Sequence, residues 1–265
     1  MVLLDGETHY ILKIKNMINF CMLYWDTGCQ IRKENTIISW IQLKKMVNYL
    51  KEKKVDVNCY LFEFGENFLF EDSIKIDFNI EFFDKSKKNN LIINHSVNND
   101  CDFLSIMDSD LFFIEEQYDL IYDHIKELET NKSKVFFTYN LLDIYEQERL
   151  EILDLENFEI NKEKLNELKP RFVWRHTWGA GVLGGIYIVP KNEIKMMGGF
   201  NENFITWGAE DDEAHTRIKE YCSWRPKMNQ GPYHLYHPKN INDEKYFIPV
   251  YSEKYFKINK VEKPK

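Results

Sequence analysis

Short apolar runs alternate with amphipathic segments through the first half of the chain. Runs at 17–24, 57–64 and 102–107 are strongly apolar, and each predicts a buried strand. Apolar residues recur at near-helical spacing over 36–50 and 115–129, which predicts a helix in each segment. Strands that alternate with helices are typical of a mostly parallel sheet with crossover helices. The pattern therefore predicts an α/β fold with helices flanking a central sheet.

The remaining segments carry weaker patterns. Asn35 is a good N-cap residue for the helix at 36–50. Residues 91–97 fit a strand or a short helix equally well, and the charged residues of 143–170 predict an exposed, mainly helical segment. Further elements are expected as an edge strand at 74–83, strands at 135–142 and 186–189, a loop at 196–207 and a helix at 210–221. No repeat or linker stands out, so residues 1–265 are expected to form one unit.

Composition narrows the classes of partner. The chain has 265 residues and a formal net charge of -8, which argues against nucleic acid as a partner because a phosphate backbone needs a basic surface. Aromatic residues make up 15% of the chain. Most of them are expected in the core, and the rest suit a pocket that stacks on bases or sugars.

The cysteines and the apolar runs bear on the compartment. Five dispersed Cys without a CxxC pair argue against a disulfide framework or a zinc site and favour a reducing compartment. No apolar run reaches the roughly 18 residues of a membrane helix, and the run at 17–25 lacks the cleavage site of a signal peptide. We expect a cytoplasmic protein that is soluble, with at most peripheral membrane contact through its mildly basic tail at 254–265.

Two carboxylates follow one of the predicted strands. Asp108 and Asp110 flank Ser109 directly after the run at 102–107. Ligands of open α/β sheets bind outside the carboxyl ends of the strands, and hard cations such as Mg²⁺ or Mn²⁺ favour carboxylate and phosphate oxygens. A solvated turn explains the same residues, so the motif alone leaves both interpretations open.

A second group of acids begins the predicted helix at 210–221. Glu210 and Asp211 are the first of four consecutive acids, and they follow Trp207 and Gly208. Acids at a helix start complement the macrodipole, which accounts for one or two of them. A carboxylate here also suits a general base that takes a proton from a hydroxyl.

Two further motifs have a functional and a structural explanation. His234 and His237 form an HxxH pair, and imidazoles near carboxylates suit Mn²⁺, although each His is also a plausible surface or core residue. Gly185 belongs to a Gly-rich stretch before the strand at 186–189. Its backbone either approaches a sugar or diphosphate closely or packs tightly at the strand entry.

The segment 174–240 resembles a known family. Gly199-Phe200-Asn201-Glu202, then Trp207-Gly208 with Glu210-Asp211, and finally a His-Leu-Tyr-His-Pro run are similar to the C-terminal region of β-1,4-galactosyltransferases and polypeptide N-acetylgalactosaminyltransferases. The resemblance is weaker over 17–140. It implies a GT-A fold, which is Rossmann-like, with a nucleotide-sugar half at about 1–140 and an acceptor-binding and catalytic half at about 141–265.

The resemblance also implies roles for individual residues. Asp110 would bind the metal, Asp108 would contact the nucleotide's ribose or the metal, and His237 would be the third ligand with His234 as the alternative. Asp211 would be the catalytic base.

Other residues would hold the two substrates. Glu210 would hold the acceptor, Trp207 would line the sugar pocket, and Glu63 would read the nucleobase. Asp26 and Arg32 are further donor-binding candidates, in a loop that lacks the family's usual proline or basic motif.

The expected activity is an inverting, metal-dependent transfer from a UDP-sugar, of galactose or N-acetylgalactosamine type, to a hydroxyl of a glycan or glycoconjugate. Mn²⁺ or Mg²⁺ would be the cofactor. One alternative is a non-catalytic nucleotide-sugar or carbohydrate-binding module, which the two intact acidic motifs argue against. Another is a metal-dependent nucleotidyltransferase, which would need a basic Gly-rich loop near the N-terminus that the sequence lacks.

Overall fold

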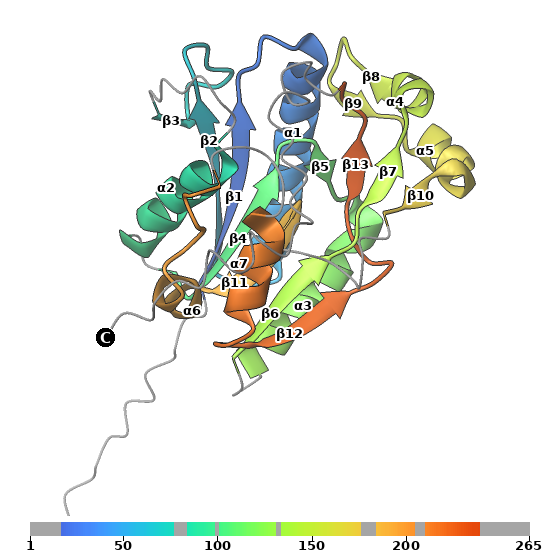
Figure 1. The fold of residues 1–265 in the computed structure, drawn as a ribbon. Helices are drawn as coiled ribbons and strands as arrows, with labels where there is room; N and C mark the ends of the chain where they lie inside the picture. Colours follow the sequence, from blue (N-terminus) through green and yellow to red (C-terminus); the bar gives the residue numbers. More distant parts are fainter. Residues whose placement is uncertain are drawn as a thin grey trace, which may run out of the picture.

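The computed structural model describes residues 17–76, 84–98, 101–130, 134–175, 184–204 and 210–238. In this part of the chain a seven-stranded sheet has the order β12-β6-β11-β4-β1-β2-β3 (Figure 1). Its strands are β1 (Ile18–Trp25), β2 (Val57–Phe64), β3 (Ile74–Ile76), β4 (Phe103–Asp108), β6 (Val135–Tyr139), β11 (Ile186–Pro190) and β12 (Ser223–Lys227). β11 runs antiparallel to β4 and β6, and the other pairs are parallel. The predicted α/β fold with a mostly parallel sheet is confirmed.

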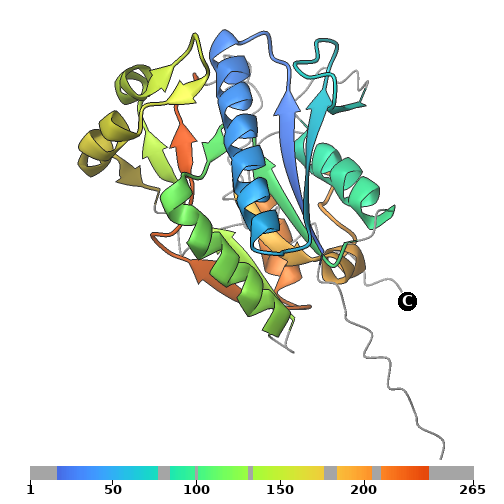
Figure 2. The same ribbon diagram turned by 180° about the vertical axis from the view of Figure 1, so that it is seen from behind.

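Helices cover both faces of this sheet. The helices α1 (Gln30–Glu52) and α3 (Tyr118–Thr130) pack on one face, which Figure 2 shows in front. The helices α2 (Lys85–Asn98), α6 (Lys191–Met196) and α7 (Glu210–Ile218) pack on the other face, which is nearer the viewer in Figure 1. Because β1 and β4 are covered on both faces, their side chains form near-continuous apolar runs, as the sequence predicted.

A smaller sheet lies to one side of the main sheet in Figure 1. Its order is β10-β7-β13-β5, and its strands are β5 (Leu111–Phe112), β7 (Leu142–Ile144), β10 (Val173–Trp174) and β13 (Tyr233–Leu235). Around it lie η1 (Glu115–Gln117), α4 (Glu146–Ile152), the hairpin of β8 (Leu153–Asp154) and β9 (Glu159–Ile160), α5 (Lys162–Leu168) and η2 (Lys169–Arg171). A third apolar cluster packs these elements together.

Several predicted boundaries were wrong. The helix predicted at 36–50 begins at Gln30, and Asn35 is a fully buried residue inside it rather than its N-cap. The first turns of α1 were missed because they carry polar side chains, which interrupt the apolar spacing. One of them, Asn35, forms hydrogen bonds with segments that are distant in sequence. The ambiguous segment at 91–97 is part of the helix α2.

Two of the predicted strands differ in extent from the observed ones. The strand expected at 135–142 splits into β6 and the start of β7, and β3 ends at Ile76, beyond which 77–83 lie outside the described residues. The segment 143–170 is not simply exposed, because the side chain of Arg149 is buried within it. Among the helices of the described ranges, none has both the length and the apolar character required to cross a bilayer.

Candidate active site

The candidate site lies at the carboxyl ends of β1, β2 and β4. Asp108 is the last residue of β4, and β11 enters at the same end because Ile186 pairs with Met107. The backbone N–H of Asp108 donates to the carbonyl of Gly185 at 2.8 Å. The sheet thus supports the Asp108–Asp110 motif from two adjacent strands.

A buried lysine joins Asp108 to the acids of α7. Lys85, the first residue of α2, places its Nζ 3.3 Å from Asp108 Oδ2 and 3.5 Å from Asp211 Oδ2. Its side chain is only 7% exposed. The structure therefore brings together two predicted acids that are far apart in sequence, and it does so through a residue that sequence reasoning missed.

The charges of this cluster are strongly coupled. Burial opposes the charge on Lys85, but the carboxylates of Asp108, Asp211 and Glu210 outweigh it and raise the pKa of this lysine. Burial raises the pKa of Asp211 well above its ordinary value, Lys85 opposes that rise, and Glu210 adds to it. A carboxylate with a raised pKa is a stronger base, which suits proton abstraction near neutral pH.

One oxygen of Asp211 is left for a ligand. While Oδ2 faces Lys85, the buried Oδ1 has no hydrogen-bond partner among the residues the structure describes. Glu210 beside it is 1% exposed. The geometry suits a carboxylate that one contact orients and that can accept a hydrogen bond through its other oxygen.

A second cluster contains Asp110, His234 and His237. One ligand atom from each of the three lies within 4.8 Å of the others. Asp110 Oδ2 is 3.1 Å from His237 Nε2, and Asp110 Oδ1 is 3.7 Å from His234 Nε2. Within the described ranges, the buried Asp110 Oδ1 has no hydrogen-bond partner. This orphaned oxygen and the two imidazoles fit a divalent cation of borderline hardness.

The smaller sheet brings these three residues together. His234 on β13 pairs with Leu111 on β5, directly after the acidic motif. The N–H of Leu235 donates to the carbonyl of Asp110 at 2.9 Å. Strand pairing therefore explains how two histidines meet a carboxylate that is remote in sequence.

Asp143 and Arg175 form an outer layer behind His234. Asp143 Oδ1 lies 2.8 Å from His234 Nδ1, and Arg175 holds Asp143 with contacts of 2.7 and 3.0 Å. Arg175 Nη2 also lies 3.0 Å from His234 Nδ1, so Asp143 and Arg175 together fix this side of the ring and leave Nε2 facing Asp110. Carboxylates commonly fix the ring and tautomer of metal-binding histidines in this way.

The electrostatics of the second cluster are opposite to those of the first. Burial opposes the charge on Asp110, but His234, His237 and Arg32 outweigh it and hold the pKa of Asp110 well below its usual value. The pKa of His237 is raised, because its contact with Asp110 outweighs the effect of burial. Asp110 is thus held as an anion.

The other predicted residues lie around these clusters or apart from them. Arg32 on α1 donates to the carbonyl of Pro238 at 3.4 Å, next to the second cluster. Asp26 follows β1 and accepts hydrogen bonds from the backbone of Gly28 at 2.9 Å and from Asn67 at 2.8 Å. These bonds outweigh burial and lower the pKa of Asp26.

Glu63 and Gly185 have clear structural roles. Glu63 is fully buried, and its two oxygens accept the backbone N–H groups of Leu69 and Phe70, so it holds a loop rather than facing the clusters. Gly185 has a φ of +73°, and a Cβ there would lie 2.9 Å from Leu141 Cδ1. The backbone conformation therefore favours glycine, and an added Cβ would also require the end of the Leu141 side chain to move. Trp207 lies outside the described residues.

Sequence reasoning missed three residues of the site. Lys85 stands among other lysines at a helix start, Asp143 begins a charged stretch, and Arg175 stands among aromatic residues. None of them forms a local motif, because each acts through residues remote in sequence. One signal in the sequence could have placed Lys85. Asp84 is a good N-cap residue, and its side chain accepts the N–H of Lys87, so Lys85 is the first residue of α2.

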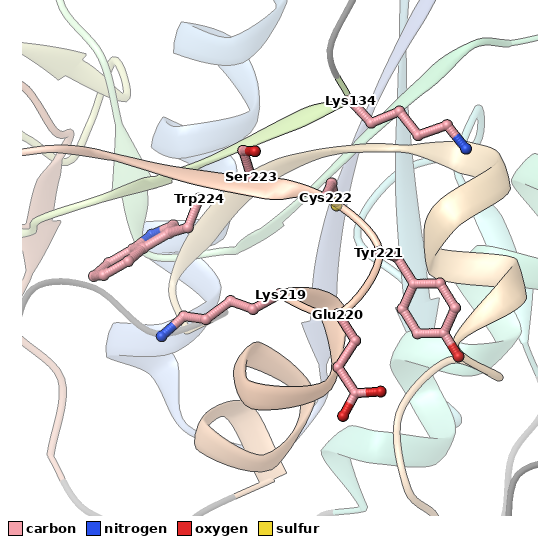
Figure 3. A pocket seen from close by; sticks show the side chains of 7 residues that line it. All are labelled: Lys134, Lys219, Glu220, Tyr221, Cys222, Ser223 and Trp224. Atoms are coloured by element: carbon pink, nitrogen blue, oxygen red, sulfur yellow. The ribbon is translucent and has the colours of Figure 1, made fainter.

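The hollow in Figure 3 lies away from both clusters. Its volume is about 650 Å³, and it is lined by Lys134, Lys219, Glu220, Tyr221, Cys222, Ser223 and Trp224. It occupies the end of α7 and the start of β12, at the edge of the sheet opposite the carboxyl ends. It contains none of the predicted site residues.

Residues 171–238 match the family model described as the N-terminal domain of galactosyltransferase. This stretch contains Gly185, Glu210, Asp211 and both histidines of the second cluster. A comparison with curated proteins gives no match.

Solved structures are similar to this chain at low sequence identity. A mycobacterial protein is 10% identical, with 86% of this chain and 70% of that chain covered and a TM-score of 0.51. The catalytic domain of Drosophila β1,4-galactosyltransferase 7 in complex with xylobiose is 15% identical, with 87% and 78% covered and a TM-score of 0.49. A mannosyltransferase from Pyrobaculum calidifontis in complex with GDP-Man and Mn²⁺ is 11% identical, with 86% and 59% covered and a TM-score of 0.48.

The family match over residues 171–238 and the α/β fold of the described residues indicate a glycosyltransferase enzyme of the GT-A type. Within that class the chain resembles the β-1,4-galactosyltransferases, as the sequence predicted.

Proposed function

We propose that this enzyme is a metal-dependent, inverting glycosyltransferase that uses a UDP-sugar. It transfers a hexose or N-acetylhexosamine, with galactose or N-acetylgalactosamine favoured, to a hydroxyl of a glycan or glycoconjugate. The observation that carries the proposal is the division of the acidic motif. Asp110 joins two histidines, whereas Asp108 shares Lys85 with Asp211. One side suits a cation and the other suits proton transfer.

Asp110, His234 and His237 would hold Mn²⁺ or Mg²⁺. When bound, the cation supplies positive charge that stabilises the departing diphosphate. The orphaned Asp110 Oδ1 and the low pKa of that carboxyl support an ionised ligand here. Asp143 keeps His234 oriented through Nδ1.

Asp211 would be the catalytic base. Lys85 holds Oδ2, and Oδ1 accepts the proton of the acceptor hydroxyl. The hydroxyl oxygen forms a bond to the anomeric carbon while the bond from that carbon to the diphosphate oxygen breaks. UDP leaves with the electron pair and the configuration inverts. Glu210 would hold a hydroxyl of the acceptor.

The remaining predicted residues would bind the donor. Asp108 would contact the ribose or the cation, and Trp207 would line the sugar pocket. Arg32 and Asp26 lie after β1, at the same edge of the sheet, and the backbone at Gly185 lies against Asp108. We propose that about 1–140 form the nucleotide-sugar half and about 141–265 the acceptor-binding and catalytic half.

The test is isothermal titration of the purified protein with UDP, with and without Mn²⁺, for the native enzyme and for Asp110→Ala. Asp154→Ala is the control, because among the described residues the side chain of Asp154 bonds within its own turn, to Glu156 and Asn157. We expect UDP binding that needs both Mn²⁺ and Asp110 and that the control retains. The same UDP affinity with and without Mn²⁺, and in the native enzyme and Asp110→Ala, would refute the metal site.

A donor screen follows from the same protein. Incubation with UDP-sugars and glycan acceptors should release UDP and give a product of inverted anomeric configuration by NMR. UDP binding without transfer or donor hydrolysis would instead support a non-catalytic binding module.

A further inference from the structure

Side chains of α1 hold the segment that carries His237 from both sides. Asn35 donates through Nδ2 to the carbonyl of Tyr236 at 3.0 Å. Arg32 donates through Nη2 to the carbonyl of Pro238 at 3.4 Å. The two carbonyls that flank His237 are therefore both bound by one helix, which comes from the opposite end of the sequence.

The orientation of Asn35 is set by Arg149. Arg149 Nε lies 2.8 Å from Asn35 Oδ1. Because a guanidinium has only donors, the amide oxygen of Asn35 must face it, and the amide nitrogen must then face Tyr236. Arg149 is itself anchored by Glu34 Oε2 at 2.7 Å. Each residue in this chain of hydrogen bonds thus donates to the next: Arg149 on α4 donates to Asn35 on α1, and Asn35 donates to the carbonyl of Tyr236.

Burial of this network is costly. Arg149 is 2% exposed and Asn35 is fully buried, in a region where α4 and α1 also contribute the apolar residues Ile152 and Ile38. A buried charge often contributes less stability than apolar residues of similar volume would. A function in positioning explains why polar groups occupy this interface.

We propose that Asn35 and Arg149 are positioning residues that place His237 for the cation. The inference rests on the proposed function and extends it to residues that do not contact the metal. Asn35 acts on the carbonyl of Tyr236, and Arg149 acts on Asn35. Outer residues of metal sites typically change metal affinity by about 10- to 100-fold. Because this path acts through backbone, we expect a loss of about tenfold.

Asn35→Asp is the sharpest variant. An aspartate keeps the contact with Arg149 as an ion pair, but it turns an acceptor oxygen toward the carbonyl of Tyr236, and the two oxygens repel. Arg149→Met frees the Asn35 amide to turn. Both variants should bind Mn²⁺ about tenfold more weakly. The double variant should lose less Mn²⁺ affinity than the product of the two single fold-changes, because both substitutions act on the contact between Asn35 and Tyr236.

The measurement is Mn²⁺ affinity of the folded protein, followed by the electron paramagnetic resonance signal of free Mn²⁺, with thermal unfolding measured in parallel. Asp110→Ala should abolish binding at this site. Arg217→Met is the matched control, because Arg217 is a half-buried arginine that holds Glu213 and the carbonyl of Met197. It should unfold at a lower temperature but bind Mn²⁺ as the native enzyme does.

The outcomes separate the inference from the proposed function. Native-like Mn²⁺ binding by Asn35→Asp and Arg149→Met, with loss in Asp110→Ala, would overturn the inference and leave the metal site standing. An equal loss in Arg217→Met would also overturn it. Absence of Mn²⁺ binding by the native protein would overturn the metal site and the inference together. If Asn35→Asp does not fold, Glu34→Gln loosens Arg149 more mildly and should still weaken Mn²⁺ binding, by less than the roughly tenfold expected for Arg149→Met.

Discussion

Two carboxylates that share one turn lie in opposite environments. Asp110 faces His234 and His237, and these neighbours with Arg32 hold its pKa low. Asp108 faces Lys85, on whose other side Asp211 has a pKa raised by burial. A short acidic motif is therefore not one functional unit. Its first acid belongs to a cluster that can bind protons, and its last acid belongs to a cluster that stays charged.

The two clusters also differ in their support. The cluster around Lys85 stands on the long strand β4 and on the first turns of α2 and α7. The cluster around Asp110 is positioned by the short strands β5 and β13 and by hydrogen bonds from side chains of α1. The first should tolerate changes in distant side chains better than the second, because more of its geometry is set by regular backbone.

The largest effect is expected from Asp211→Asn. An amide cannot take the proton of the acceptor hydroxyl, and general-base catalysis contributes about 10²- to 10⁴-fold. We expect kcat to fall about 10³-fold. Affinities for Mn²⁺ and UDP should not change, because Asp211 belongs to the other cluster. Initial rates of UDP release and isothermal titration measure the two quantities.

Two results of that experiment would break the comparison. Full activity would show that Asp211 is not the base. A parallel loss of Mn²⁺ affinity would show that the two clusters act as one site rather than as two.

The main sheet could be predicted because β1 and β4 are covered on both faces and form near-continuous apolar runs. The smaller sheet could not, because β5 has two residues and β13 has three, which is too short for any periodicity. Its existence depends on pairing between remote segments. The sequence therefore predicted the main fold but not the scaffold of the second cluster.

The site follows the same division. Asp110, Asp211 and His237 stand in local motifs and could be predicted by motif or resemblance, and their roles stay predictions. Lys85 and Asp143 were missed because each is recognisable only by its partner, Asp211 or His234, which lies far away in sequence. Trp207 stays a prediction.

Asp143→Asn should produce the next largest effect. The amide loses the charge that pairs with Arg175 and the strong acceptor for His234 Nδ1. We expect Mn²⁺ affinity to fall about 10- to 100-fold. Asp154→Asn is the matched control, since the bonds of Asp154 to described residues lie within its own turn. Unchanged Mn²⁺ binding by Asp143→Asn would mean that Asp143 does not hold His234 for the cation.

Lys85→Met tests the proton-binding cluster. Lys85 lowers the raised pKa of Asp211, so its removal should raise that pKa further. The base is active when ionised, so activity is lost as pH falls through this pKa. The acidic limb of the kcat/KM profile should therefore move to higher pH, by about one unit for a close opposite charge. At a pH on this limb, activity should fall about tenfold. A shift to lower pH would contradict the assignment of Asp211.

The smallest effect is expected from Gly185→Ala, and it tests how independent the clusters are. A left-handed conformation costs a non-glycine residue about 1–2 kcal/mol, and Gly185 has a φ of +73°. The added Cβ also meets the side chain of Leu141 at 2.9 Å, where a flexible leucine can move. We expect the free energy of unfolding to fall by about 2 kcal/mol and transfer to slow a few-fold, because the carbonyl of Gly185 holds the N–H of Asp108. Denaturant unfolding and initial rates measure these changes.

Mn²⁺ affinity of the Gly185→Ala variant should stay within twofold of native, because Asp110 is held separately by Leu235. A loss of Mn²⁺ affinity as large as that of Asp143→Asn would show that a displacement at Asp108 passes through the turn to Asp110, and the two environments would then have to be treated as one.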